Sequence, residues 1–280
     1  MRPLFTRTSI HLRGLVTHRK PSTPRTATEK HPRSNPVHYS ERIHTRMANP
    51  LSIRTEPLYQ KDGQKYTHTS TLTSIQPLSS LPHDTQALFK PPPETTPYIL
   101  TTPSTIFHAQ GGGQPSDTGT IASPTGGATF HVHQVRKVDP TILHMGVFSP
   151  PDTPFADHQD GKQPIDQKVD IQKRILHSRI HTAGHVIGLA INQLIQDGTL
   201  PPTILDSKAS HYPGASFVEF CGLIPGSAKP LIQAHVDAMV AQDLPVQIEF
   251  WSAEKARSEC TGGGVGLVQD GGGDGVTGGI

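Results

Sequence analysis

Three histidines follow one another at four-residue spacing in the segment HSRIHTAGH, residues 177–185: His177, His181 and His185. On a helix, residues four apart share a face, with Cβ atoms about 5–6 Å apart. Two such imidazoles can reach one metal ion, as they do in zinc-binding helices. The alternative is three histidines that only share a helix face. The segment lacks the glutamate of H-E-x-x-H, so it does not indicate a zincin-type protease.

A glycine-rich stretch, FHAQGGGQPSDTG at residues 107–119, is the second candidate for chemistry. Gly111, Gly112 and Gly113 allow backbone amides to converge on an anion or to approach a ligand closely. A tight hairpin is the alternative interpretation. The stretch matches neither the Walker pattern nor G-x-G-x-x-G, so it does not indicate a nucleotide phosphate loop.

Together, GGGQPSDTG and, about seventy residues later, HTAGHVIGLA resemble the editing domain of alanyl-tRNA synthetase and the free-standing alanyl-tRNA editing proteins. The resemblance covers residues 55–260. It implies an α+β fold, in which a small antiparallel β-barrel-like domain carries a Gly-Gly-Gln motif. An α+β domain of the threonyl/alanyl-tRNA synthetase type then follows.

The resemblance also implies a site. The family's His-x-x-x-His zinc ligands fall on His181 and His185, because HTAGH precedes an apolar run and HSRIH does not. His177 is then a neighbour one turn earlier. Gly111, Gly112, Gly113 and Gln114 are implied to bind the 3′-terminal adenosine or its ester, and Gln114 and His181 to be catalytic. Gln110 stands where the family often has an acidic residue.

In the family, a later Cys-x-x-x-His completes the zinc site. This sequence has no such element: Cys260 is followed by TGGGV, and the last histidine is His235. Because His181 and His185 are two ligands of four, we expect Zn²⁺ to bind weakly and substoichiometrically.

These motifs lead to three hypotheses. The first is a trans-editing, zinc-dependent hydrolase that deacylates tRNA(Ala) mischarged with serine or glycine, impaired here by the incomplete site. The second is a non-catalytic synthetase-like relic that binds tRNA or a partner weakly. The third is a histidine-rich structural domain with no link to tRNA. No class II ATP-site motif is present, so a ligase is not indicated. The expected partner is the 3′ end of tRNA(Ala), with no DNA and no membrane.

The elements around the motifs are read from periodicity. Residues 50–165 alternate in short stretches such as KYTHTSTLTSI and ATFHVHQVRKV, the second with a slip between Val132 and Val135, and predict a β-rich domain. Residues 166–198 predict a helix, capped by Asp166 or Asp170 and ended by Asp197-Gly198. Its expected buried positions are Leu176, Ile180, Ala183, Ile187, Ala190 and Leu194.

Three further elements are expected in residues 166–260, the editing-type domain. ASFVEFCGLI (215–224) predicts a strand. LIQAHVDAMVAQD (231–243) predicts a helix with one apolar face, made of Ile232, Val236, Met239 and Val240. PVQIEFW (245–251) alternates and predicts a second strand.

The two ends differ in composition from the body. Residues 1–46 carry ten Lys and Arg against two acids, Glu29 and Glu41, and fit a mitochondrial transit peptide or an extension before a start at Met47. A mitochondrial or cytoplasmic location is therefore expected. Residues 261–280 are glycine-rich and are expected to be disordered. Two cysteines, Cys221 and Cys260, do not make a disulfide framework. The remaining body is acidic, so a general nucleic-acid binder is not indicated.

Overall fold

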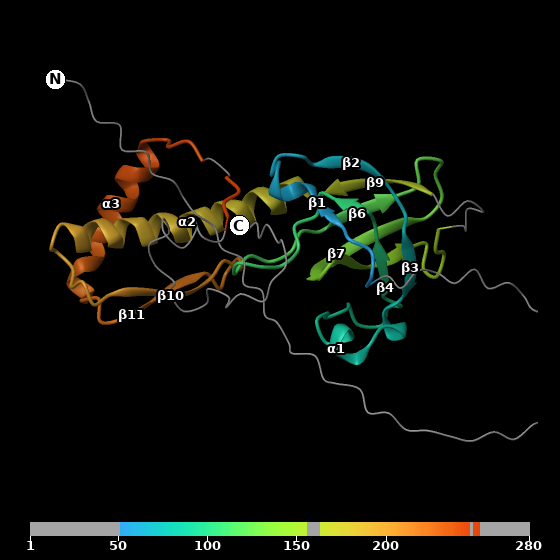
Figure 1. Cartoon of the computed structure of the whole chain (residues 1–280), viewed down its shortest axis with the longest axis horizontal. Coiled ribbons are helices and arrows are strands. Elements are labelled where there is room, and N and C mark those ends of the chain that lie inside the picture. The colour runs from blue at the N-terminus through green and yellow to red at the C-terminus, as the bar shows by residue number, and fades with distance from the viewer. Residues whose placement is uncertain (1–50, 156–162, 247–248, 253–280) are drawn as a thin grey trace, which may run out of the picture.

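The structure is a computed structural model that describes residues 51–155, 163–246 and 249–252. The predicted leader (1–46) and glycine-rich tail (261–280) lie outside these residues. A β sheet forms one half of the molecule, and the long helix α2 (Ile171–Gln196) runs from it into the other half, beside helix α3 (Lys229–Ala241) (Figure 1). Among the described residues, no helix is long and apolar enough to cross a membrane.

Seven strands form one antiparallel sheet, which curls into a half-barrel. Their order across the sheet is β2-β9-β6-β7-β8-β4-β3. The strands are β2 (Thr67–Thr71), β3 (Ser74–Pro77), β4 (Tyr98–Thr101), β6 (Gly119–Ala122), β7 (Thr129–Val138), β8 (Thr141–Ser149) and β9 (Pro164–Val169). A short parallel pair, β1 (Glu56–Pro57) and β5 (Ser104–Thr105), forms a separate two-stranded sheet, and side chains of β5 bond to β2 and β8. The predicted α+β class and β-rich first part are therefore confirmed in outline.

The alternation read from the sequence corresponds to the pleat of the sheet. In β7, Phe130, Val132 and Val135 are buried, and the pairing with β8 shifts register between Val132 and Gln134. The predicted slip is thus a β-bulge, which returns Val135 to the core face. The described residues also form four short helical turns: η1 (Leu58–Gln60), η2 (Leu78–Ser80), α1 (His83–Gln86) and η3 (Gly226–Ala228).

Helix α2 begins at the second of the two predicted caps. The Asp170 side chain accepts a hydrogen bond from the Lys173 backbone N–H at 3.1 Å, which satisfies one free amide of the first turn. Asp166 does not cap the helix, because it lies in β9, paired with Thr69 and Ala122. The helix ends as predicted at Asp197, followed by Gly198 in the left-handed region (φ 74°).

The predicted buried face of α2 is right only near its C-terminal end. Ala190 and Leu194 are buried, but Leu176 is 47% exposed. In the N-terminal turns the buried residues are polar: Arg174, His177 and His181. The sheet half contacts this end of the helix with polar groups, so the apolar periodicity did not reveal which face is buried there.

The second half of the molecule is built around the C-terminal part of α2. The hairpin of β10 (Leu205–Ser210) and β11 (Phe217–Cys221) and helix α3 enclose a separate small core with it. That core contains Ile191, Leu194, Leu200 and Ile204. The predicted strand at 215–224 and helix at 231–243 are confirmed, with Met239 buried but Val240 68% exposed. Strand β10 was not predicted.

Two further predictions concern the domain boundary at residues 165/166 and the strand at residues 245–251. The division at residue 165/166 stays a prediction; strand β9 lies across it. The predicted strand at 245–251 is wrong for its described residues 245–246 and 249–251, which are in no strand; residues 247–248 lie outside the described part.

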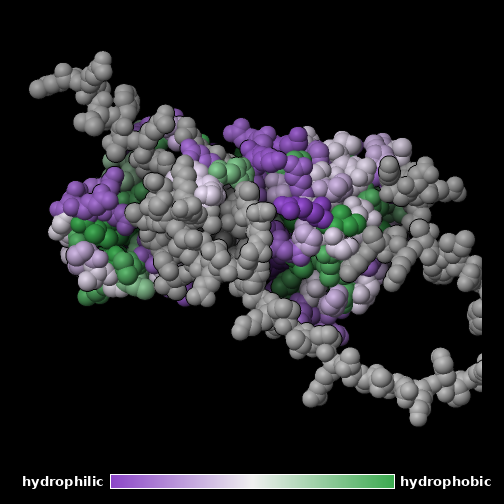
Figure 2. Space-filling view, viewed as in Figure 1, coloured by the Kyte–Doolittle hydropathy of each residue, from purple (hydrophilic) through white to green (hydrophobic). Residues whose placement is uncertain are grey.

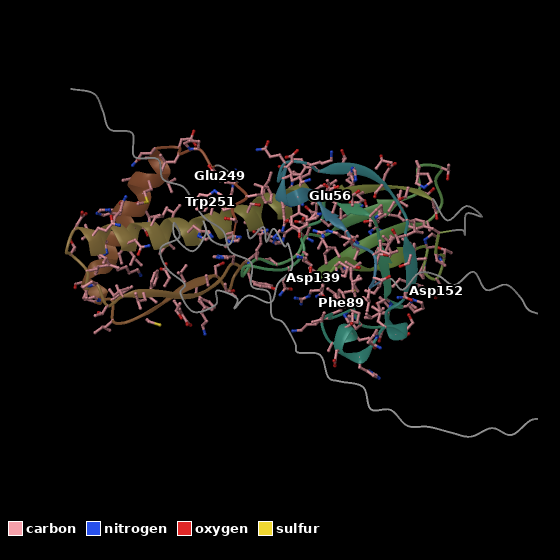
Figure 3. The ribbon with its side chains drawn as sticks, viewed as in Figure 1. Glu56, Phe89, Asp139, Asp152, Glu249 and Trp251 are labelled. Atoms are coloured by element: carbon pink, nitrogen blue, oxygen red, sulfur yellow. The ribbon has the colours of Figure 1, made fainter. Side chains whose placement is uncertain are left out.

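Apolar residues gather at the end of the molecule where α3 and the β10–β11 hairpin lie (Figure 2). In the same view, Glu249 and Trp251 lie over the α2 half and Glu56 and Asp152 over the sheet half (Figure 3).

Candidate functional site

The glycine-rich motif forms a tight turn, the simpler of its two interpretations. The Gln114 backbone N–H donates to the Gly111 carbonyl at 2.9 Å, and the Gly111 N–H donates back to Gln114 at 3.3 Å. Gly112 and Gly113 between them have φ of 56° and 78°. Two successive left-handed residues favour glycine, which explains why the turn is Gly-Gly.

This turn presents Gln114 to helix α2. The Gln114 side chain is buried, and its Oε1 accepts a hydrogen bond at 2.8 Å from Nδ1 of His181. The proton of the His181 ring therefore sits on Nδ1, and Nε2 keeps its lone pair. The contact joins the two motifs that the sequence places about seventy residues apart.

Three imidazoles gather beyond this contact. The ring of His181 lies 5.0 Å from that of His185 and 4.4 Å from that of His211, measured between centroids, and His185 and His211 are 6.3 Å apart. His185 and His181 are one turn apart on α2, whereas His211 directly follows β10. Sequence reasoning missed His211.

Two glycines make room for the His211 ring. A Cβ on Gly184 of the helix would lie 2.4 Å from Cε1 of His211. A Cβ on Gly113 would lie 3.1 Å from Cδ2 of His211 and 2.7 Å from the Ala209 carbonyl oxygen. The His211 backbone N–H also donates to the Gly113 carbonyl at 2.9 Å. His211 therefore contacts the glycine turn and helix α2 from the end of strand β10.

A buried ion pair fixes the same turn to the start of α2. Nε of Arg174 donates to both oxygens of Asp117 at 2.9 Å, and its NH2 group also contacts Asp117 Oδ2. The other carboxylate contact is the His108 backbone N–H at 2.6 Å. Arg174 further donates to the carbonyls of Gly63 and Ile106. Both charges are therefore paired, as burial requires.

Burial keeps the clustered imidazoles neutral. Desolvation, helped by His211, His185 and His108, lowers the pKa of His181 to about 3. Desolvation also lowers the pKa of His185, with a contribution from His211, and that of His211 itself. At neutral pH these rings therefore have lone pairs available, the state in which imidazole binds a metal ion.

The two histidines of the predicted zinc pair each have a ring nitrogen with no hydrogen bond to the described residues. Nε2 of His185 is buried without a hydrogen-bond partner among the described residues, and Nε2 of His181 is the free lone pair of that ring. Both nitrogens suit a divalent metal ion. Within the described part of the chain, however, no three His, Cys, Asp or Glu side chains stand as a ready metal site. Cys221 is exposed, and Cys260 lies outside the described residues.

His177, the third histidine of the sequence motif, lies apart from the cluster. Its ring is buried, and Nδ1 has no hydrogen-bond partner in the described residues. Burial lowers the pKa of His177, an effect that Asp117 opposes. The ring contacts of the cluster involve His181, His185 and His211 and, among the described residues, not His177.

Comparison with known proteins places these motifs in context. The chain is 33% identical over 161 residues, 54% of its length, to the alanine–tRNA ligase of Methanothrix thermoacetophila. It is 35% identical over 92 residues to the alanyl-tRNA editing protein AlaX-M of Methanosarcina barkeri, and 36% identical over 89 residues to that of Methanosarcina acetivorans. The chain resembles alanyl-tRNA editing proteins and segments of alanine–tRNA ligases. The resemblance inferred from the two motifs is thereby confirmed.

The chain spans only part of each of these relatives: 15% of the ligase, and 35% and 36% of the two AlaX-M proteins. No protein-family model matches it.

Three residues of the site had no recognised role at the sequence level. Asp117 stands in the glycine-rich stretch and Arg174 three residues before the histidine segment, but their pairing becomes visible only once the turn lies against α2. His211, in KASHYPG, belongs to no periodic pattern. A signal for it existed in Gly184: a glycine in the middle of a long helix disfavours the helix, and usually has a packing reason.

Proposed function

We propose that this chain is a trans-editing hydrolase that removes serine or glycine from wrongly charged tRNA(Ala). The hydrogen bond between Gln114 and His181 carries the proposal, because it joins the glycine turn and the histidine helix in one buried site. The names of the similar proteins, alanine–tRNA ligase and alanyl-tRNA editing protein, support alanyl-tRNA editing as the activity.

The residues of the chain have separable parts in this proposal. Oε1 of Gln114 accepts a hydrogen bond from Nδ1–H of His181 and so fixes the orientation and tautomer of that ring. Gly111 and Gly112 are exposed on the turn beside it, where the 3′-terminal adenosine and the ester approach the backbone. His181 and His185 would hold Zn²⁺ through Nε2, and such an ion would supply polarisation of the ester carbonyl or a lowered pKa for the attacking water.

A second candidate is a relic that binds tRNA(Ala) without hydrolysing the ester. One observation favours it: no complete metal ligand set stands ready among the described residues. The sequence also contains no Cys-x-x-x-His. A metal site with only two protein ligands binds its ion weakly, so we expect slow hydrolysis by this chain.

Deacylation of tRNA(Ala) carrying labelled serine separates the two candidates. We expect hydrolysis little faster than in buffer by the chain alone, and a clear rise when a family-like C-terminal segment carrying Cys-x-x-x-His is appended. In the extended chain, Gln114→Ala and His181→Ala each remove most of the gain, about tenfold or more. Gln110→Ala, a change in the same loop, is the matched control and retains it.

No gain on extension, with tRNA still bound, would favour the relic. Fast hydrolysis by the unextended chain, insensitive to His181→Ala, would show that the metal pair is not needed and would direct attention to Gln114 and the 111–113 backbone.

A further inference from the structure

A groove of about 450 Å³ lies on the solvent side of the sheet, beside the first turn of helix α2. Strands β6, β7 and β9 line it together with that turn, and four of its lining residues are basic: Lys168, Lys173, His131 and His133. Burial, His131 and Lys173 lower the pKa of His133, so these groups are close enough to repel one another. The candidate site of Gln114 and His181 does not use any of them.

Strand pairing places three polar side chains of the groove in one row. Thr120 of β6 lies opposite Lys168 of β9 on one side and opposite His131 of β7 on the other. Neighbouring strands are about 4.8 Å apart, so the row extends about 10 Å across the sheet. The row faces away from the core, because the next residues along β6 and β7, Ile121 and Val132, are buried.

Carboxylates do not balance these cations. Among the described residues that line the groove, only Asp170 is acidic: its Oδ1 caps the helix and its Oδ2 lies 3.7 Å from Nζ of Lys173. Lys168 is exposed and forms no ion pair with a described residue. Asp166 is also exposed on β9, but its Oδ1 accepts a hydrogen bond from the Thr69 hydroxyl at 2.7 Å. A cleft with such an excess of one charge attracts an anion.

The groove continues the candidate site along helix α2. Three side-chain contacts join residues 114–118 to the helix in order: Gln114 with His181, Asp117 with Arg174, and Thr118 with Lys173. In the last of these, Nζ of Lys173 donates to the Thr118 hydroxyl oxygen at 3.2 Å. Lys173 precedes His181 by eight residues, which is about 12 Å along the helix axis. A ligand longer than this distance can therefore occupy the site and the groove together.

We propose that the groove binds backbone phosphates of the tRNA acceptor arm whose 3′ end lies at the glycine turn. This inference rests on the proposed function. The phosphates that precede the terminal adenosine belong to the same strand as the ester, so they lie over the surface next to the site. Lys168 and Lys173 supply the positive charge, and Thr120 and His131 supply hydrogen-bonding groups between β9 and β7. Because the body of the chain is acidic, its affinity for a polyanion has to come from a local cluster of this kind.

Binding of uncharged tRNA(Ala) to the full chain tests the groove without any hydrolysis. Fluorescence anisotropy is measured over a range of NaCl concentrations for the unmodified chain and for Lys168→Gln/Lys173→Gln. The control, Lys137→Gln/Lys208→Gln, removes the same charge from exposed lysines outside the groove. We expect the groove variant to bind about tenfold more weakly and its plot of log K against log [NaCl] to be flatter by about 1.5. The control should stay within about twofold of the unmodified chain.

Equal losses in the two variants would show a general attraction to a polyanion and would overturn the inference. Failure of the unmodified chain to bind tRNA(Ala) would overturn it as well. Vesicles that contain phosphatidylserine are the competing ligand: a loss in the groove variant with vesicles and not with tRNA would assign the groove to a membrane surface instead.

Kinetics of the chain extended with Cys-x-x-x-His separate this inference from the proposed function. The groove variant should raise KM for Ser-tRNA(Ala) about tenfold and leave kcat unchanged, since the lysines contact the substrate far from the ester. A fall in kcat at unchanged KM would contradict a binding role. Groove-dependent tRNA binding without deacylation would count against the proposed function and leave the groove standing.

Discussion

The two ends of helix α2 bury opposite kinds of side chain. In the first turns the buried residues are Arg174, His177 and His181, which face the sheet half. In the last turns they are Ala190, Ile191 and Leu194, which pack against β11 and α3. One helix therefore serves as a site wall at one end and as a core element at the other.

The difference shows what each end requires of its partner. The apolar end needs only surfaces of suitable volume, and its contribution is the area removed from water. The polar end needs a matched group for each donor and acceptor, because an unpaired buried charge costs several kcal/mol. Asp117 and Gln114 supply such groups from the glycine-motif segment. The candidate site is therefore at the end of α2 where each buried group needs a matched partner.

Removing the carboxylate at the polar end should produce the largest loss of stability. In Asp117→Ala, the Arg174 guanidinium stays buried without its counter-charge, so we expect a loss of about 3–5 kcal/mol in the free energy of unfolding. Urea unfolding measures it. Lys61→Ala, which breaks an exposed pair with Glu56, is the control and should cost about 1 kcal/mol or less. An Asp117→Ala chain as stable as the control would mean that the pair does not hold the two halves together.

Truncation at the apolar end should cost somewhat less and act on stability alone. Leu194 is 2% exposed in the small core, so Leu194→Ala should lose about 2–5 kcal/mol. Leu176→Ala, on the same helix but 47% exposed, should change stability by about 0.5 kcal/mol or less. Metal titration of the folded Leu194→Ala chain should match the unmodified chain. A loss of metal affinity there would show that the two ends of the helix are coupled.

The contrast also explains how far the sequence could be read. Apolar periodicity placed α2, β7 and β11, but it missed β10 and wrongly predicted a strand at 245–251. The resemblance carried by the two motifs implied that Gln114 and His181 share a site. Apolar periodicity failed at Leu176, because the first turns of α2 contact polar groups, and buried polar residues follow no periodic pattern that the sequence shows. It could not place His211, whose neighbours come from three segments. Nor could it show that the turn at Gly112 and Gly113 is closed by its own backbone bonds rather than by a ligand.

Lowering the pH should reduce the stability of the chain through His144, a buried histidine of the sheet half that is not part of the candidate site. His144 on β8 donates from Nδ1 to the Leu100 carbonyl at 3.0 Å and accepts at Nε2 from the Thr105 hydroxyl at 2.8 Å. Because Nδ1 donates to the Leu100 carbonyl, the neutral ring has its lone pair at Nε2, facing the Thr105 hydroxyl. Burial lowers the pKa of His144 to about 4, below its ordinary value of 6.5.

The unfolded chain therefore binds more protons below pH 6.5, and stability falls as pH drops from 6.5 toward 4. His144 contributes at most about 1.4 kcal/mol per pH unit to that fall. His144→Gln keeps a donor and an acceptor but does not titrate, so its stability should depend less steeply on pH across this window. His131→Gln on the surface is the matched control. Equal slopes in the His144→Gln and unmodified chains would contradict the neutral network.

The smallest expected effect concerns the third histidine of the motif, and it fixes the register of the site. His177 precedes His181 by one turn, so sequence spacing alone allows either His177 with His181 or His181 with His185 as the pair. The structure brings His211 to the second pair, and Gly184 admits it there. We therefore expect His177→Ala to leave the affinity for Co²⁺, a spectroscopic substitute for Zn²⁺, within about twofold of the unmodified chain, whereas His185→Ala weakens it about tenfold or more. Removing a buried ring should still lower stability modestly, so metal titration is carried out well below the unfolding temperature of each variant. If His177→Ala weakened Co²⁺ binding as much as His185→Ala, the metal would lie one turn closer to Asp117, and the pair would be His177 and His181.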